Sequence, residues 1–378
     1  MWVLDLFCKT KKCSECNMRK NNSTSFDTTN KEEKSEKTID DYYLEMKIFY
    51  ERFKHNSRTG LGDKYKEWEY NLLYTLSTAQ YRDVMYRELA KKIKSAVKNN
   101  EFEKLRALLY QSVFLKTVFL KNVPNGLSGG CDHSGRFFEV MGYISCLGFD
   151  SVYRCFPKDI PLCTNGYPLT VINTNLLLCI LYNNAEYKKY DETTVVSKAE
   201  KRILTKSDKA LRGVTMCLLG ILKHDVAKFN AGLPILLKNY NRIGLLNESE
   251  KALCQFAISL VVIAKKFFTE KEFHDIVFPE SKNFSRQYCE YIFSKDSFEP
   301  KIFYEYPDEL SPLNQLLLTP IPITKLTKEQ AYRIAYEGLD ENAFKTILDE
   351  DRMVMDFILE YRARKQNNTP VSIAENTR

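Results

Sequence analysis

Three cysteines near the N-terminus, Cys8, Cys13 and Cys16, lie within nine residues of one another. The last two form a C-S-E-C pair, and paired CxxC elements bind zinc because a tetrahedral Zn²⁺ ion takes four ligands. Only three thiols are available here, and neither a second CxxC pair nor a pair of histidines follows nearby. The pattern therefore favours reduced thiols in a polar tail, with a zinc site as the alternative.

Cys131 and His133 stand two positions apart in the segment GGCDHSG, which suggests a thiol nucleophile and its base. Residues i and i+2 seldom face each other, however, and the members of a catalytic triad usually come from distant parts of a sequence. We expect Asp132 or Ser134 instead to cap a helix that starts near Arg136. The sequence also holds no HExxH, GxxxxGK[ST] or GxSxG motif. It predicts no catalytic residue, no metal site, no cofactor and no enzymatic activity.

Acidic and aromatic side chains are mixed in FEPKIFYEYPDEL, residues 298–310, and more acids occur in LDENAFKTILDEDRMVMD, residues 339–356. Pro300 and Pro307 should keep the first segment out of a helix. Aromatic anchors beside charges are typical of protein-binding hot spots. The predicted partner-binding residues are Glu299, Phe303, Tyr304, Glu305, Tyr306, Asp308, Glu309, Asp349, Glu350 and Asp351. The alternative is a linker followed by a solvated helix face, since charge runs are usually exposed surface.

The rest of the chain is organised around the stretch SEKALCQFAISLVVIAKKFF, residues 249–268. Its apolar residues occupy every side of a helix, and a helix that is apolar all round is buried. The apolar part, residues 252–264, is too short to span a bilayer, which takes ~20 residues. Asn247 and Glu250 stand where the N-cap and capping-box residues of such a helix are expected. The sequence therefore predicts one buried central helix.

Helical periodicity recurs through most of the chain, and no convincing alternation of apolar and polar residues indicates a strand. The predicted helices cover residues 40–55, a long stretch ending near 97, 101–121, 137–147, 170–181, a part of 183–206, 208–223, 226–240, 249–268, 284–294, 311–318, 328–337, 341–349 and 351–365. Glycine and proline indicate loops at 123–135 and 157–168, and a short turn is expected around YRCFP. The predicted fold is all-α, an irregular stack of antiparallel helical hairpins around the buried central helix.

Gly213 and Gly220 lie seven residues apart in GVTMCLLG, on one face of a predicted helix. Glycine inside a helix costs about 1 kcal/mol relative to alanine, so the pair indicates that another helix approaches closely. We expect Ala257 and Ala264 of the central helix to lie opposite these glycines, because they are small.

The chain has 378 residues, of which 44% are hydrophobic, and can bury a sizeable core. Its net charge of +7 forms no basic stripe, so nucleic acid is not an expected partner. The predicted organisation is a mobile polar tail (1–38), an all-helical domain (39–366) with a sub-boundary near 183–206, and a flexible C-terminal tail (367–378). Most of the eleven cysteines lie in apolar runs and no secretory signal precedes them. We therefore expect reduced thiols, no membrane association and a cytoplasmic location.

Three segments carry a resemblance to a known family: FFEVMGYISCLGFDSVYRCFP, NGYPLTVINTNLLLCILYN and KALRGVTMCLLGILKHDVAKFNAGLPILLKNY, followed by the central helix. From about residue 70 to 320 the chain resembles an all-helical family of bacterial immunity proteins that neutralise polymorphic toxins. The resemblance implies a protein that binds the toxin domain of a secreted effector, without catalysis or a cofactor. A helical-repeat scaffold or peptide-binding regulator is the alternative, since stacked hairpins serve that role equally well.

Overall fold

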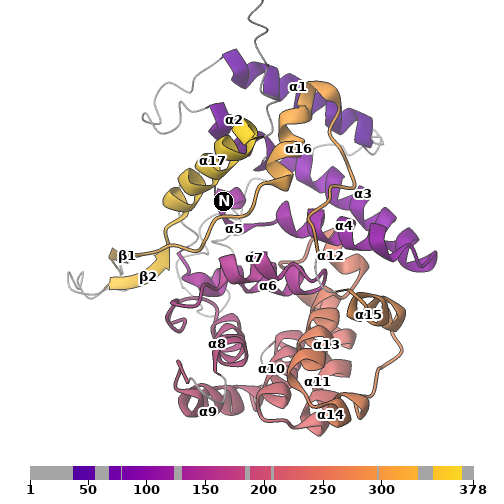
Figure 1. The fold of residues 1–378 in the computed structure, drawn as a ribbon, viewed down its shortest axis with the longest axis vertical. Coiled ribbons are helices and arrows are strands. Elements are labelled where there is room, and N and C mark those ends of the chain that lie inside the picture. Colours follow the sequence, from indigo (N-terminus) through magenta and orange to yellow (C-terminus); the bar gives the residue numbers. More distant parts are fainter. Residues whose placement is uncertain are drawn as a thin grey trace, which may run out of the picture. The chain divides into compact units, whose positions relative to one another are not determined.

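The computed structural model describes residues 37–55, 68–77, 79–122, 130–183, 188–205, 208–295, 298–330 and 344–367. In these ranges the chain forms seventeen α-helices and one two-stranded sheet, which confirms the predicted all-α class (Figure 1). No helix in these ranges is long and apolar enough to cross a membrane. Cys8, Cys13, Cys16 and nearly all of the two predicted tails lie outside the described residues.

Helices from both ends of the described chain share one hydrophobic core. α1 packs against α2 and α3, α3 packs on α4, and α17 contacts α2, α5 and α16 (Figure 1). Their bounds are α1 (Ile39–His55), α2 (Trp68–Ser77), α3 (Ala79–Lys98), α4 (Phe102–Phe114), α5 (Val118–Asn122), α16 (Ser311–Leu318) and α17 (Glu350–Asn367). A 3₁₀ turn, η5 (Asp308–Leu310), leads into α16 and touches α1.

The middle of the chain forms helices that pack mainly on their neighbours in sequence. The bounds are η3 (His133–Arg136), α6 (Phe137–Ile144), α7 (Phe149–Cys155), α8 (Pro168–Tyr182), α9 (Glu192–Ile203), α10 (Lys209–Leu222), α11 (Val226–Asn239), η4 (Tyr240–Arg242), α12 (Glu248–Ala252), α13 (Gln255–Phe267), α14 (Glu270–His274) and α15 (Arg286–Phe293). α9 packs on α8 and α10, so the described part of the expected sub-boundary region belongs to this body. Asp191, Asp208 and Asp225 cap α9, α10 and α11 by accepting hydrogen bonds from their first amides.

The central helix consists of two helices, so the prediction of one continuous helix over 249–268 is wrong. α12 ends at Ala252 and α13 begins at Gln255, because Leu253 between them is extended (φ −146°, ψ 135°). The amide of Cys254 donates to the carbonyl of Asn283 at 2.6 Å. This bond to a distant segment takes the place of a helical one.

The burial predicted for this region is confirmed. Every residue of α13 from Gln255 to Ala264 is buried, and the helix packs against α6, α10, α11, α14 and α15. Ser259, polar and buried, directs its hydroxyl to the carbonyl oxygens of Met141 and Gln255. The expected capping box of Asn247 and Glu250 is present at the start of α12.

Two segments predicted as helices are strands where the structure describes them. β1 (Leu326–Gln330) and β2 (Phe344–Leu348) form an antiparallel pair. The predictions of helices over 328–337 and 341–349 are therefore wrong in these parts, whereas 331–343 lie outside the described residues.

Hydrogen bonds to residues far away in the sequence account for the extended conformation of β2. The amide of Leu348 donates to the carbonyl of Cys131 at 2.9 Å, and the carboxamide of Asn165 donates to the carbonyl of Thr346 at 3.0 Å. Such bonds, together with the pairing to β1, satisfy backbone groups that a helix would satisfy locally. A local apolar periodicity cannot reveal them.

The glycines of α10 face α11 rather than the central helix. A Cβ added at Gly213 would lie 2.7 Å from the amide nitrogen of Leu236 and 2.9 Å from the carbonyl oxygen of Gly232. At Gly220 it would lie 2.8 Å from the amide nitrogen of Phe229. The close approach is confirmed, but Ala257 and Ala264 are not the partners, because the short connection brings α11 directly back along α10.

Replacing Gly213 with alanine should destabilise the protein by about 1–3 kcal/mol, the usual cost of overpacking. The clash is with backbone atoms, which cannot rotate away, so it should exceed the gain in helix propensity of about 1 kcal/mol. Gly244→Ala is the matched control, because no atom lies within 4 Å of its added Cβ. Urea denaturation measures both variants. Equal midpoints would show that the two helices can separate at no cost.

Candidate protein-binding groove

The first predicted partner segment, residues 298–310, runs past α4 as extended chain and is fastened there by one side chain. Gln111, buried in α4, accepts hydrogen bonds from the amides of Phe303 (3.2 Å) and Tyr304 (2.9 Å). Its carboxamide nitrogen donates to the carbonyl of Tyr304 at 2.9 Å. A carboxamide offers both a donor and an acceptor, so it bonds the segment as a neighbouring strand would. The expectation that the whole segment stays out of a helix is confirmed for residues 298–307, whereas Asp308–Leu310 form the 3₁₀ turn η5.

The aromatic side chains of this segment face the protein. Tyr306 is only 3% exposed, and its hydroxyl lies 2.9 Å from that of Tyr42 in α1. Asn314 holds the amide and the carbonyl of Tyr306 at 2.7 and 3.0 Å. Phe303 is half-buried, with the ammonium group of Lys104 5.1 Å from its ring centre. These rings anchor the segment to its own protein, which the sequence pattern does not distinguish from anchoring a partner.

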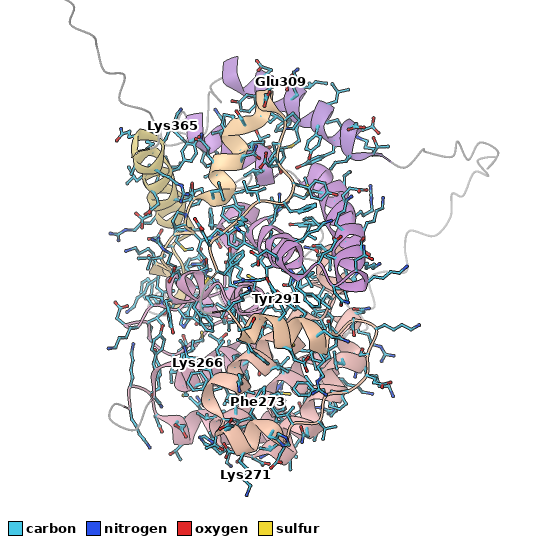
Figure 2. The ribbon with its side chains drawn as sticks, turned by 45° about the vertical axis from the view of Figure 1, so that its right-hand side comes forward. Lys266, Lys271, Phe273, Tyr291, Glu309 and Lys365 are labelled. Carbon is cyan, nitrogen blue, oxygen red and sulfur yellow. The ribbon has the colours of Figure 1, made fainter. Side chains whose placement is uncertain are left out.

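The acids of the segment remain on the surface. Exposed members are Glu299, Glu305, Asp308 and Glu309. Glu309, at the α1 end of the molecule (Figure 2), pairs with Lys47 at 2.6 Å. Both side chains are about half exposed, so the pair contributes little to stability. Tyr304 is half-buried, and burial raises its pKa to about 12.

The second acidic stretch begins α17. The Asp349 carboxylate accepts a hydrogen bond from the amide of Arg352 at 3.1 Å, and acids in the first turn complement the helix dipole. Glu350 is buried and Asp351 is exposed. Figure 1 shows the start of α17 beside β2, well apart from the chain between α15 and α16. The structure therefore does not bring Asp349, Glu350 and Asp351 together with the acids of 298–310.

Two adjoining hollows lie between α7, α17 and the chain that leads from α16 to β1. Their volumes are about 510 and 390 Å³, and Arg154, Pro320 and Ile323 line both. Other lining residues are Asp150, Tyr153, Glu299 and Arg364 in the larger hollow and Lys325, Asp356, Leu359 and Glu360 in the smaller. We call the two hollows together the α7–α17 groove.

Arg154 of α7 joins the walls of this groove. Its guanidinium donates to the carbonyl of Ile321 at 3.2 Å and lies 3.8 Å from the carboxylate of Glu360 in α17. The amide of Thr324 donates in return to the carbonyl of Arg154 at 2.9 Å. Residues 319–325 are thus held in an extended form that their alternating prolines favour. The expected turn around YRCFP is in fact helical up to the end of α7.

Exposed apolar side chains gather in the α7–α17 groove. Tyr153 is 41% exposed, Ile323 44% and Leu359 57%. The charged lining residues are Arg154, Lys325 and Arg364 with Asp150, Glu299, Asp356 and Glu360. Large apolar side chains in a depression, surrounded by charges of both signs, are typical of a surface that binds another protein.

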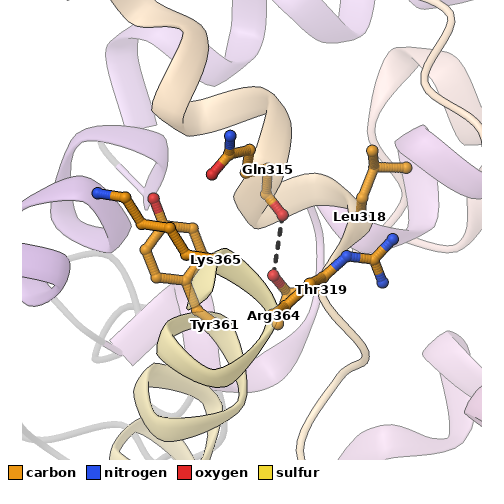
Figure 3. Close-up of a pocket in the computed structure, with 6 residues that line it drawn as sticks. All are labelled: Gln315, Leu318, Thr319, Tyr361, Arg364 and Lys365. Atoms are coloured by element: carbon orange, nitrogen blue, oxygen red, sulfur yellow. Dashed lines mark hydrogen bonds between the residues drawn. The ribbon is translucent and has the colours of Figure 1, made fainter. Parts of the chain in front are cut away.

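A third, smaller hollow of about 50 Å³ adjoins the groove through Leu318 and Arg364. Figure 3 shows its lining, with Tyr361 and Lys365 of α17 facing Gln315 of α16. The hydroxyl of Thr319 donates to the carbonyl of Gln315 at 2.8 Å and so closes the end of α16. This hollow extends the surface along α17 without adding an exposed apolar anchor.

Most of the groove is absent from the sequence-based prediction. Glu299 is its one predicted residue, and Tyr153, Ile323 and Leu359 are new. The segment TPIPIT, residues 319–324, carries a usable signal, because alternating prolines favour extended chain and leave little room for helical burial of Ile323. No comparable signal identifies Leu359, which lies within an ordinary helical pattern.

The expected capping role of Asp132 is confirmed for the 3₁₀ turn η3 only, since α6, which begins at Phe137, has no side-chain cap. The Asp132 carboxylate accepts a hydrogen bond from the amide of Ser134 at 2.9 Å and starts η3, which leads into α6. His133 is buried, and loss of hydration lowers its pKa to about 4. Burial beside Asp132 raises the pKa of the Cys131 thiol, which disfavours the thiolate. This environment lacks the features that activate a cysteine nucleophile.

Comparison with protein-family models, curated proteins and solved structures finds no match to this chain. Its function is therefore argued from the groove.

Proposed function

We propose that this chain is a non-catalytic binding protein that holds a segment of another polypeptide in the α7–α17 groove. The observation that carries the proposal is the presence of three exposed apolar side chains, Tyr153, Ile323 and Leu359, in two adjoining hollows, with Ile323 lining both. Apolar anchors of this size provide most of the binding energy in protein interfaces, at ~2 kcal/mol or more for a hot-spot residue.

The mixed charge of the groove favours a polypeptide over a nucleic acid. Binding a phosphate backbone depends on several Arg and Lys side chains that neutralise it. In the groove Arg154 faces Glu360, and Arg364 shares the larger hollow with Glu299. A segment that carries charges of both signs beside an apolar side chain would complement this lining.

The partner we propose is the toxin domain of a secreted effector, which binding would inhibit. This step rests on the resemblance of residues 137–157, 165–183 and 209–240 to immunity proteins. A specific interface usually buries ~1,200–2,000 Å², so the groove would be the anchoring centre of a larger contact. Exposed acids such as Glu305 and Asp308 are available for its rim.

Replacing Ile323 and Leu359 together with arginine should weaken partner binding at least tenfold, which corresponds to about 1.4 kcal/mol. The product of the reading frame beside this gene is co-expressed with the wild-type or the variant chain, and growth is followed. Calorimetric titration of the purified pair then gives the affinity. Wild-type chain should restore growth, whereas the groove variant should not.

Leu44→Arg is the matched control, because Leu44 lies on α1, outside the groove lining, and is 59% exposed. It should bind and protect like the wild type. Full protection by the groove variant would show that the partner binds elsewhere. The acids of 298–310 would then be the next surface to test. If the product of the neighbouring reading frame is not toxic, the immunity function is contradicted. The helical-repeat scaffold or peptide-binding regulator is then the remaining function.

A further inference from the structure

Asp132, His133 and Cys163 meet inside the protein, where the turn before α6 lies against the loop before α8. All three residues are buried. One carboxylate oxygen, one ring nitrogen and the thiol sulfur all lie within 4.8 Å of one another. Oxygen, imidazole nitrogen and thiolate sulfur are the donor atoms that zinc takes in proteins.

The carboxylate of Asp132 is fixed in place by hydrogen bonds from backbone amides. It accepts hydrogen bonds from the amides of Thr164 at 2.6 Å and Asn165 at 2.8 Å, in addition to that of Ser134 at 2.9 Å. These bonds clip the loop before α8 to the turn before α6.

Cys163 is held equally firmly. Its amide donates to the Asn175 side chain at 2.7 Å, and its carbonyl accepts from the same carboxamide at 3.1 Å. The two loops pack so closely that a Cβ at Gly166 would lie 2.2 Å from the hydroxyl oxygen of Ser134. Gly166 also has φ +146°, which side-chain-bearing residues rarely adopt. Ligands supported by such outer bonds are characteristic of metal sites.

The buried imidazole ring of His133 lacks well-formed hydrogen bonds. Neither ring nitrogen makes a hydrogen bond of normal geometry, although the carbonyl of Pro161 lies near enough to favour the protonated ring slightly. Thr174 Oγ1 is likewise buried without a hydrogen bond of normal geometry, although the Cys163 sulfur lies within its reach. A buried unsatisfied polar group costs about 1–3 kcal/mol and usually marks a water or an ion. Several such atoms at one place indicate that a water molecule or an ion binds among them.

We propose that Asp132, His133 and Cys163 bind a divalent transition-metal ion of the zinc class. Bond lengths of ~2.0–2.3 Å place tetrahedral ligands roughly 3.5 Å apart, so the separations between the three ligand atoms, which reach at most 4.8 Å, would shorten by about 1.3 Å or less. Thr174 or a water molecule would complete the tetrahedron. Zinc binding replaces the thiol proton, which passes to solvent, so the metal–sulfur bond forms without any change in oxidation state.

The role of this ion would be structural, because a site closed to solvent leaves no position for a substrate. It would tie the start of η3 to the loop before α8. η3 ends at Arg136, whose guanidinium donates to the carbonyl of Pro322 and the hydroxyl of Thr324, in the segment that forms a groove wall. The metal proposal is independent of the function proposed for that groove.

The test uses full-length, tag-free chain in which Cys8, Cys13 and Cys16 are changed to serine, so that the N-terminal thiols cannot bind metal. After dialysis against buffered zinc, plasma mass spectrometry should find about one zinc per chain. Cobalt in place of zinc should give a thiolate-to-cobalt charge-transfer band and tetrahedral visible bands. His133→Asn and Cys163→Ala should each lose the zinc, and Cys163→Ala should also lose the charge-transfer band. The matched control Cys289→Ala, at another buried cysteine, should keep both.

The cobalt spectrum decides the matter even if a ligand variant fails to fold, because it needs only the serine-substituted chain. Absence of bound zinc and of the charge-transfer band in that folded chain would overturn the proposal. A buried water molecule would then be the partner of these polar atoms. Zinc retained by both His133→Asn and Cys163→Ala would also overturn it. A zinc ion lost only when the three N-terminal cysteines are changed would belong to the tail instead.

Discussion

Replacing Glu139 with leucine should lower the free energy of unfolding by about 3–5 kcal/mol, the usual cost of breaking a buried ion pair. Arg136 is fully buried, and its Nε and Nη2 lie 3.2 and 3.1 Å from one oxygen of Glu139. The other oxygen of Glu139 accepts a hydrogen bond from the amide of Val118 at 2.6 Å. The substitution leaves a guanidinium without its countercharge and an amide without its acceptor. Guanidinium chloride denaturation measures the loss.

The double variant Arg136→Met with Glu139→Leu is the control that identifies the cause. Replacing a whole buried pair with apolar residues is often neutral, so the second change should restore much of the lost stability. Recovery should be partial, because Arg136 also donates to Pro322 and Thr324 at 3.1 and 2.8 Å. If Glu139→Leu alone is as stable as the wild type, the pair is not buried as described here.

Leu260→Asp should unfold the protein or destabilise it by several kcal/mol, since an unpaired charge in a packed core has no compensating partner. Leu260 lies in α13, whose residues from Gln255 to Ala264 are all buried among five other helices. The expected result is insoluble protein or a melting temperature far below that of the wild type. Circular dichroism and size-exclusion chromatography measure it.

The same substitution at an exposed leucine tests whether the loss of stability comes from burial or from the change of residue type. Leu359→Asp, on α17, should change stability by about 0.5 kcal/mol or less, as is usual for surface positions. A soluble Leu260→Asp variant that melts with the wild type would place α13 at the surface. An equally large effect at Leu359 would show that α17 is more deeply packed than its 57% exposure indicates.

Much of the helical structure follows from short-range patterns in the sequence. The all-round apolar run of α13 predicts its burial, and the three-residue spacing of Asn247 and Glu250 predicts the capping box that starts α12. Likewise, Gly213 and Gly220 predict a close helix contact, because only a backbone approach compensates for glycine inside a helix. In each case the interacting groups lie within a few turns of each other, or the residue type itself carries the information.

Partner-binding residues are harder to predict, because side chains that anchor a loop internally and side chains that bind a partner look alike in sequence. Glu299 is the one predicted residue that lines the α7–α17 groove. Tyr306 was predicted as an anchor for a partner and is an anchor for its own segment, through Tyr42 and Asn314. Exposure decides between the two roles, and exposure depends on what packs against the segment.

Extended chain and the groove form through contacts between residues that are distant in the sequence. Gln111 binds Tyr304 across 193 residues of sequence, and Arg136 binds Thr324 across 188. Hydrogen bonds between residues distant in the sequence, Cys254 to Asn283 and Leu348 to Cys131, also break the central helix and hold β2 extended. Helical periodicity and caps act over a few residues, so the sequence alone predicts a helical protein with a buried α13. The strands, the helix break and the groove depend on pairings between distant residues, which local patterns do not encode.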